Sequence, residues 1–92
     1  MNRACKVNCK VSPGMFRGEY MAKLRAICPD GQAKDVHAFV NRISLESVKS
    51  GRALLRATLV SKNRSGIGVV LPQPTFENGP SVLVPRDTVT VG

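Results

Sequence analysis

The chain has 92 residues, of which 42% are hydrophobic, and its 14 Lys and Arg outnumber six Asp and Glu to give a net charge of +8. This length predicts one domain over residues 1–92 with a modest core, and the apolar content excludes a disordered chain. No segment reaches the roughly 18 apolar residues of a membrane helix, and residues 1–10 lack the apolar centre of a secretory signal. We therefore expect a cytoplasmic protein with no membrane partner.

Residues 5–11 alternate between apolar and polar side chains, which predicts a strand with one buried and one solvated face. Cys5 and Cys9 fall on the buried face, about 13 Å apart, which is too far for a disulfide or for ligating the same zinc ion. Cys28 could approach either thiol across a sheet, but an intracellular setting argues against a stable bridge. We expect reduced core cysteines and neither a metal site nor a cofactor.

Pro13 and Gly14 end the first strand, and the following loop carries Met15 and Phe16 next to Arg17. Large apolar side chains among chain-breaking residues have two interpretations. They fold back as a plug over one end of a barrel, which is the interpretation we favour here, or they remain exposed as a contact surface.

Residues 20–27 and 34–41 alternate in the same way, and Pro29-Asp30-Gly31 between them is a strong turn signal, so a β-hairpin is predicted. Residues 44–50 are predicted as a short helix, because Ser44 can cap it, Glu46 suits a first turn and Gly51 can end it. A continuing strand or an irregular loop is the alternative.

The longest strand-like run, residues 52–60, is followed by a turn at 62–66 and a second run at 67–71, which predicts a central β-hairpin. Residues 72–80 hold three prolines, which remove backbone donors, so a loop or a sheet edge is expected there. Residues 81–84 and 88–91 are predicted as short final strands.

Together these elements predict an all-β fold, a small single-domain β-barrel of five to seven short antiparallel strands. The tail from Gly79 to Val89, a strand that runs into Pro85-Arg86-Asp87 and a closing strand, resembles the end of an SH3-like barrel, which we favour. The aromatic set of a peptide-binding SH3 groove is absent, so proline-rich peptides are not implied as ligands. An OB-like barrel is the alternative, because three strands, a short helix and two more strands follow its order.

Enzyme chemistry has little support in the sequence. The one histidine, His37, lies in a predicted strand without a partner that would orient it for catalysis. No nucleophile elbow, phosphate-binding loop or metalloprotease motif occurs. We therefore expect no enzymatic activity.

The placement of the basic residues suggests RNA or DNA as a partner. They lie on the polar faces of three predicted strands, at a hairpin tip and in a loop: Lys6, Lys10, Lys23, Arg25, Arg56, Lys62, Arg64 and Arg17. If the first two strands are neighbours, their four cations form one stripe suited to a phosphate backbone. A solvated face that serves only solubility is the alternative interpretation of this charge, and no strand carries an aromatic pair for base stacking.

A protein-interaction or assembly module is the alternative function. Met15, Phe16 and Phe76 lie in two loops rich in chain-breaking residues. Exposed together, they would form an apolar patch for a protein partner or for self-association.

Overall fold

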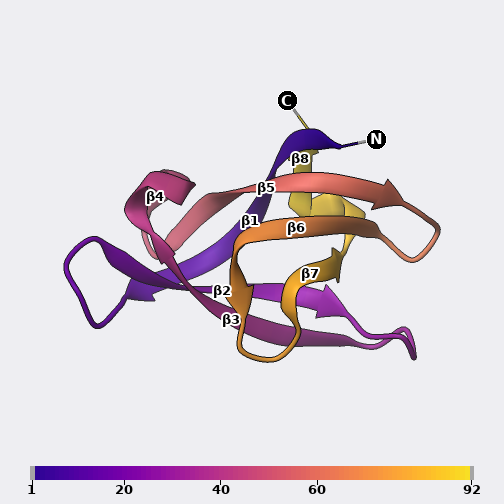
Figure 1. Cartoon of the computed structure of the whole chain (residues 1–92), viewed down its shortest axis with the longest axis horizontal. Coiled ribbons are helices and arrows are strands. Elements are labelled where there is room, and N and C mark those ends of the chain that lie inside the picture. Colours follow the sequence, from indigo (N-terminus) through magenta and orange to yellow (C-terminus); the bar gives the residue numbers. More distant parts are fainter. Residues whose placement is uncertain (1, 92) are drawn as a thin grey trace.

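The computed structural model describes residues 2–91, most of which form one antiparallel sheet (Figure 1). In chain order its elements are β1 (Arg3–Pro13), β2 (Glu19–Ile27), β3 (Ala33–Asn41), the 3-10 turn η1 (Arg42–Ser44), β4 (Leu45–Lys49), β5 (Arg52–Lys62), β6 (Ile67–Thr75), β7 (Gly79–Val84), the 3-10 turn η2 (Arg86–Thr88) and β8 (Val89–Val91). The all-β prediction is confirmed, and the described residues form eight strands where five to seven were expected, because β4 takes the place of the predicted helix.

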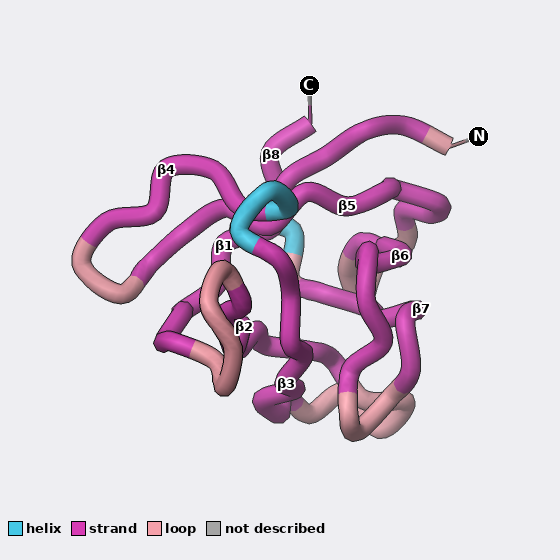
Figure 2. The backbone as a smooth tube through the Cα atoms, turned by 60° about the vertical axis from the view of Figure 1, so that its left-hand side comes forward, coloured by secondary structure: helices cyan, strands magenta, loops and turns pink. Residues whose placement is uncertain are grey.

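The sheet follows the order β3-β2-β1-β5-β6-β7, with β4 added to β5 and β8 added to β1. It curls so that β3 lies against β6 and β2 against β7, which gives a half-barrel consistent with the predicted small β-barrel (Figure 2). One side of β1 is shared, because its residues 10–13 pair with β2 and its residues 5–7 pair with β8. This division of β1 is important for the site described below.

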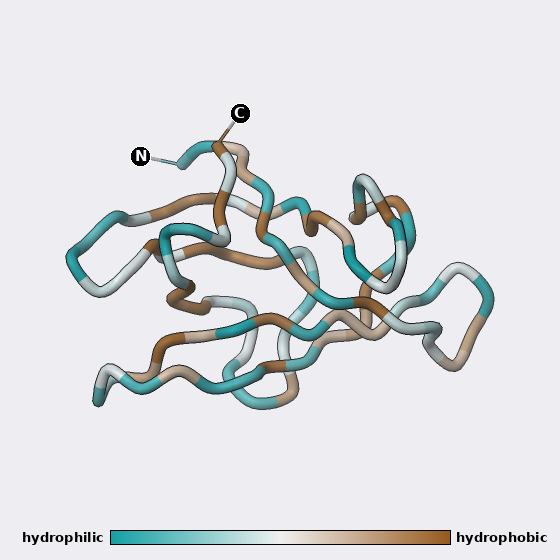
Figure 3. Tube along the Cα trace, turned by 180° about the vertical axis from the view of Figure 1, so that it is seen from behind, coloured by the Kyte–Doolittle hydropathy of each residue, from teal (hydrophilic) through white to brown (hydrophobic). Residues whose placement is uncertain are grey.

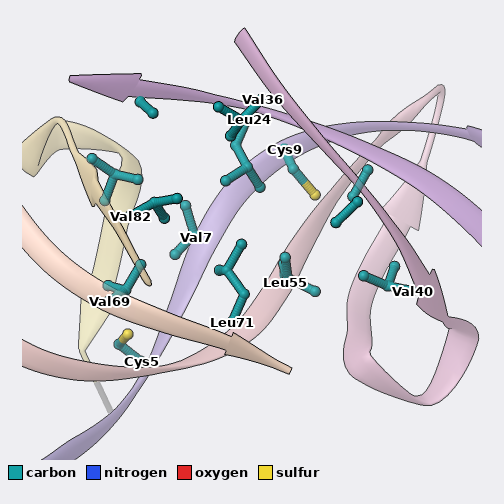
Figure 4. Packing of buried hydrophobic residues seen from close by; sticks show 14 of the residues in the cluster. Cys5, Val7, Cys9, Leu24, Val36, Val40, Leu55, Val69, Leu71 and Val82 are labelled. Atoms are coloured by element: carbon teal, nitrogen blue, oxygen red, sulfur yellow. The ribbon is translucent and has the colours of Figure 1, made fainter. Parts of the chain in front are cut away.

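The core lies inside the curl and is built from small aliphatic side chains (Figure 4). Val7, Leu55 and Val69 are fully buried, and the alternation predicted for β1, β2, β3 and β5 places the expected residues inside. Along the trace, apolar positions recur within the strands, while the β5–β6 turn is hydrophilic (Figure 3). Cys5 and Cys9 lie in this core as free thiols, as expected.

Both predicted hairpin turns are present. Gly31 adopts φ of +86° in the β2–β3 turn, a conformation that favours glycine. In the β5–β6 turn, the Asn63 side chain accepts hydrogen bonds from the backbone N–H groups of Ser65 and Gly66 at 3.0 and 3.1 Å.

The predicted helix at residues 44–50 is wrong, and the alternative of a strand is correct. Leu45 is buried opposite Leu55, so pairing of β4 with β5 gains core contacts that a two-turn helix would lack. Ser50 and Gly51 both have positive φ, as a two-residue hairpin turn of type I′ requires. The OB-like alternative loses the helix that motivated it, and the SH3-like assignment stays a prediction.

The proline-rich segment is more regular than expected, because β6 extends to Thr75. Its pairing with β7 breaks between Val70 and Thr75, so Pro72 and Pro74 occupy positions that need no ladder hydrogen bond from β7. The predicted order at the tail is confirmed: β7 runs into the turn η2, and β8 then pairs with β1. No helix within residues 2–91 is long and apolar enough to cross a bilayer.

Candidate functional site

The outer face of the sheet carries a row of basic side chains that crosses five strands. Lys10 of β1 lies directly opposite Lys23 of β2 on one side and Arg52 of β5 on the other. Arg52 in turn faces Lys49 of β4, and Lys23 faces His37 of β3. Directly paired residues project from the same face of a sheet, so these five side chains form one line. We call Lys49, Arg52, Lys10 and Lys23 the basic row, with His37 at its end.

The basic row brings like charges together without compensation. It contains three directly opposed pairs of cations, and such pairs destabilise a sheet because their side chains lie about 5 Å apart. Among the residues that the structure describes, none of the ion pairs involves the four cations of the row, whereas His37 at its end contacts Glu77. The row is therefore a concentrated, unneutralised positive surface.

Lys6 and Arg56 provide the contrast, since they also face each other across β1 and β5. Glu46 lies between them, at 3.1 Å from Lys6 Nζ and 2.7 Å from Arg56 Nε. Hydrogen bonds, first from Arg56 and then from Lys6, lower the pKa of the Glu46 carboxyl below its usual range. One carboxylate thus serves two cations here, an arrangement that the basic row lacks.

A cleft of about 430 Å³ opens beside the row, where β1 passes from β2 to β8. Asn8 and Cys9 have no partner in either strand, which leaves a gap in the sheet between the two pairings. Lys10, Lys23, Arg25 and Arg52 supply its positive lining, and Asp35 and Asp87 also contribute to the wall. The cleft extends the basic surface inward but is not purely cationic.

The β6–β7 turn is hydrogen-bonded to the edge of β3 at the His37 end of the basic row. Glu77 accepts the backbone N–H of His37 at 2.8 Å through Oε1, and its Oε2 lies 2.6 Å from His37 Nδ1. The Phe76 N–H donates to the His37 carbonyl oxygen at 2.8 Å. Hydrogen bonding to His37 lowers the pKa of Glu77, so its carboxylate form is favoured in this contact.

The structure brings together only part of the predicted basic set. The condition for the basic stripe is met, because β1 and β2 are neighbours, and Lys10 and Lys23 lie side by side with Arg25 at the adjoining cleft. Lys6 and Arg56 lie on the same face but share Glu46. The β5–β6 tip with Lys62 and Arg64 and the β1–β2 loop with Arg17 lie at opposite ends of the molecule (Figure 1).

The favoured plug interpretation of the β1–β2 loop is wrong. Met15 and Phe16 are 79% and 72% exposed, because the loop points away from the barrel. The Glu19 carboxylate accepts their backbone N–H groups at 2.9 and 3.4 Å, and a side chain at Gly14 would collide with Glu19. The loop therefore holds its apolar tip outward in a defined conformation.

Phe76 is also exposed, at 62%, but it lies in a different part of the molecule from Met15 and Phe16. The β6–β7 turn and the β1–β2 loop are well separated in Figures 1 and 3. The ring of Phe76 instead contacts Phe39 of β3, with ring centroids 5.3 Å apart and planes at 70°. The three side chains do not form the single patch considered from the sequence.

Sequence reasoning missed Lys49, Arg52 and the His37–Glu77 contact. Arg52 begins the central strand, and Lys49 fell in the predicted helix. The two residues pair because β4 and β5 form a hairpin, which was not predicted. A Ser-Gly pair between two basic residues is a turn signal that could have revealed it. His37 and Glu77 are 40 residues apart, and no local pattern joins them.

Comparison of the chain with protein-family models, curated protein sequences and solved structures gives no match. The chain's own geometry is therefore the basis for assigning a function. Within residues 2–91 no group of three or more His, Cys, Asp or Glu side chains is placed to hold a metal ion.

Proposed function

We propose that this protein is a small, non-enzymatic barrel of the SH3-like type that works in the cytoplasm and binds nucleic acid. The phosphate backbone lies along the four cations of the basic row, beside the cleft that Arg25 lines. Phosphates supply the charge that the row lacks, since each contact neutralises a cation and releases a condensed counterion. Contacts of this kind give affinity for RNA or DNA without reading the sequence.

The observation that carries this proposal is the unneutralised line of cations itself. Three like-charged pairs on neighbouring strands oppose folding, while the similar Lys6–Arg56 pair has a carboxylate between its members. A surface kept only for solubility gains nothing from bringing its cations together, because dispersed charges serve equally well. With strands about 4.8 Å apart, the line through His37 spans roughly 19 Å, enough for a few nucleotides.

Oligonucleotide binding at two salt concentrations tests this function. Four neutralised phosphates predict that log Kd changes with log salt by about 2.8 for a single strand, or roughly a 50-fold weaker affinity between about 50 and 200 mM salt. Fluorescence anisotropy with labelled RNA and DNA measures both affinities. Absence of binding at the lower salt concentration would rule out the proposed function.

A protein-interaction module is a second candidate, supported by the exposed apolar tip of the β1–β2 loop. Met15 and Phe16 are held outward. The Arg42 N–H donates to the Gly18 carbonyl oxygen, and this hydrogen bond joins the end of the loop to the turn η1, where Ile43 is 78% exposed. Self-association through this tip would persist at high salt, because salt strengthens apolar contacts. Light scattering of the free protein at low and high salt distinguishes this behaviour from charge-driven binding.

A further inference from the structure

Two phenylalanines that are far apart in the sequence meet at the His37 end of the basic row. Phe39 follows His37 by two residues on the outer face of β3, and the β6–β7 turn places Phe76 against it. The turn is fixed there by the hydrogen bond from Phe76 N–H to the His37 carbonyl oxygen and by the two contacts of Glu77 with His37. Phe76 nevertheless remains 62% exposed, so much of its ring is available to a ligand.

An uncharged row continues from this aromatic pair, parallel to the basic row. Phe39 lies opposite Met21 of β2, and Met21 lies opposite Ser12 of β1. Each member is two residues from its counterpart in the basic row, a separation of about 7 Å along the strand. A shallow hollow of about 260 Å³ lies between the two rows and includes Lys10, Met21 and Lys23 in its lining.

Adjacent cationic and apolar rows match the two chemical parts of a nucleotide. A phosphate on the basic row leaves its base free to extend across the hollow toward Met21 and the exposed ring of Phe76. Stacking on an aromatic ring requires an unpaired base, whereas the bases of a duplex are already stacked on one another and shielded by the backbone. The cationic row and the exposed ring can therefore both contact a single-stranded nucleic acid, whereas a duplex can contact only the cations.

We propose that the protein binds single-stranded nucleic acid in preference to duplex, with bases stacking on Phe76 beside the basic row. This inference rests on the proposed function, because the row must first engage phosphates. It further specifies the ligand class and adds an aromatic contact residue that lies outside the basic surface.

A tryptophan reporter at position 76 tests the stacking directly, because the chain contains no tryptophan. Phe76→Trp keeps an aromatic face at this site, so a single strand of about ten nucleotides should bind and quench its fluorescence, while the matching duplex should quench it far less. Phe76→Ala should weaken single-strand binding roughly 5- to 150-fold and leave the salt dependence unchanged. Phe16→Ala, at another exposed phenylalanine in the distant β1–β2 loop, is the matched control and should bind normally.

The outcomes separate this inference from the function on which it rests. Equal affinity for the single strand and the duplex, or equal affinity of Phe76→Ala and Phe16→Ala, would overturn base stacking while phosphate binding stands, provided that binding still weakens with salt. No binding of either nucleic acid at about 50 mM salt would overturn both proposals. Circular dichroism of each variant establishes that it is folded, and Phe76→Trp tests stacking even if the alanine variant does not fold.

Discussion

Replacing Lys10 by glutamate should make the protein more stable while it weakens nucleic-acid binding. Lys10 has a cation directly opposite on each side, Lys23 and Arg52, so the substitution converts two like-charge pairs into two opposite-charge pairs. Cross-strand pairs contribute roughly 0.2–1 kcal/mol each, and exposure to solvent keeps the gain small. We expect a total of about 0.5–1.5 kcal/mol, or a rise in Tm of roughly 2–10 °C for a domain of this size.

Thermal unfolding followed by circular dichroism measures this gain, and salt identifies its origin. At about 1 M salt the Debye length falls to about 3 Å, so the difference between the variant and the natural chain should largely disappear. Lys62→Glu is the control, because it makes the same change in net charge at a residue that faces the uncharged Ile67. If Lys10→Glu fails to gain stability at low salt, or if Lys62→Glu gains as much, the repulsion assigned to the basic row does not exist.

Further predictions concern the core thiols and Glu46. Burial raises the pKa of the Cys9 thiol from 9.0 to about 11. The contribution of this thiol to the free energy of unfolding is therefore complete below about pH 9 and declines as the pH rises toward 11. Cys9→Ala should flatten that decline in the free energy of unfolding measured by denaturant titrations. Cys9 should also react with a soluble thiol reagent more slowly than the half-buried Cys28, and equal rates in the native state would contradict the burial. The pKa of Glu46 is lowered from 4.5, so its stabilising effect is present above about pH 4.5 and declines as the pH falls through its lower folded value. Glu46→Gln should remove this part of the pH dependence of stability and, by releasing Lys6 and Arg56, make nucleic-acid binding more sensitive to salt. If neither the pH dependence of stability nor the salt dependence of binding changes, Glu46 does not neutralise Lys6 and Arg56.

The strands were predictable from the sequence wherever one face is buried. The period of two in residues 5–11 and 20–27 reflects a physical constraint, because a shift by one residue would expose every core side chain. Turn chemistry was equally reliable at Pro29-Asp30-Gly31, where Gly31 needs its positive φ. It was ambiguous at residues 44–51, since Ser, Glu and Gly suit both a short helix and a type I′ hairpin. The burial of Leu45 against Leu55, a tertiary contact, favoured the strand.

The candidate site was less predictable, because alternation identifies a face but not a register. Lys10 and Lys23 could be assigned to outer faces, yet their direct opposition depends on which residues pair across β1 and β2. The same limit applies to Arg52, whose alignment with Lys10 is fixed by the long β1–β5 pairing. The aromatic pair of Phe39 and Phe76 depends on a turn that crosses to β3, and local sequence contains no sign of it.

The most direct test of the central claim compares the salt dependence of single-strand binding in three proteins. These are the natural chain, Lys10→Gln/Lys23→Gln in the basic row, and Lys62→Gln/Arg64→Gln at the β5–β6 tip, which carries the same loss of charge. The basic row predicts that log Kd changes with log salt by about 2.8 in the natural chain and the tip variant but by only about 1.4 in the row variant. An equal reduction in both variants would mean that net charge alone binds the strand, and it would contradict a site built from the basic row.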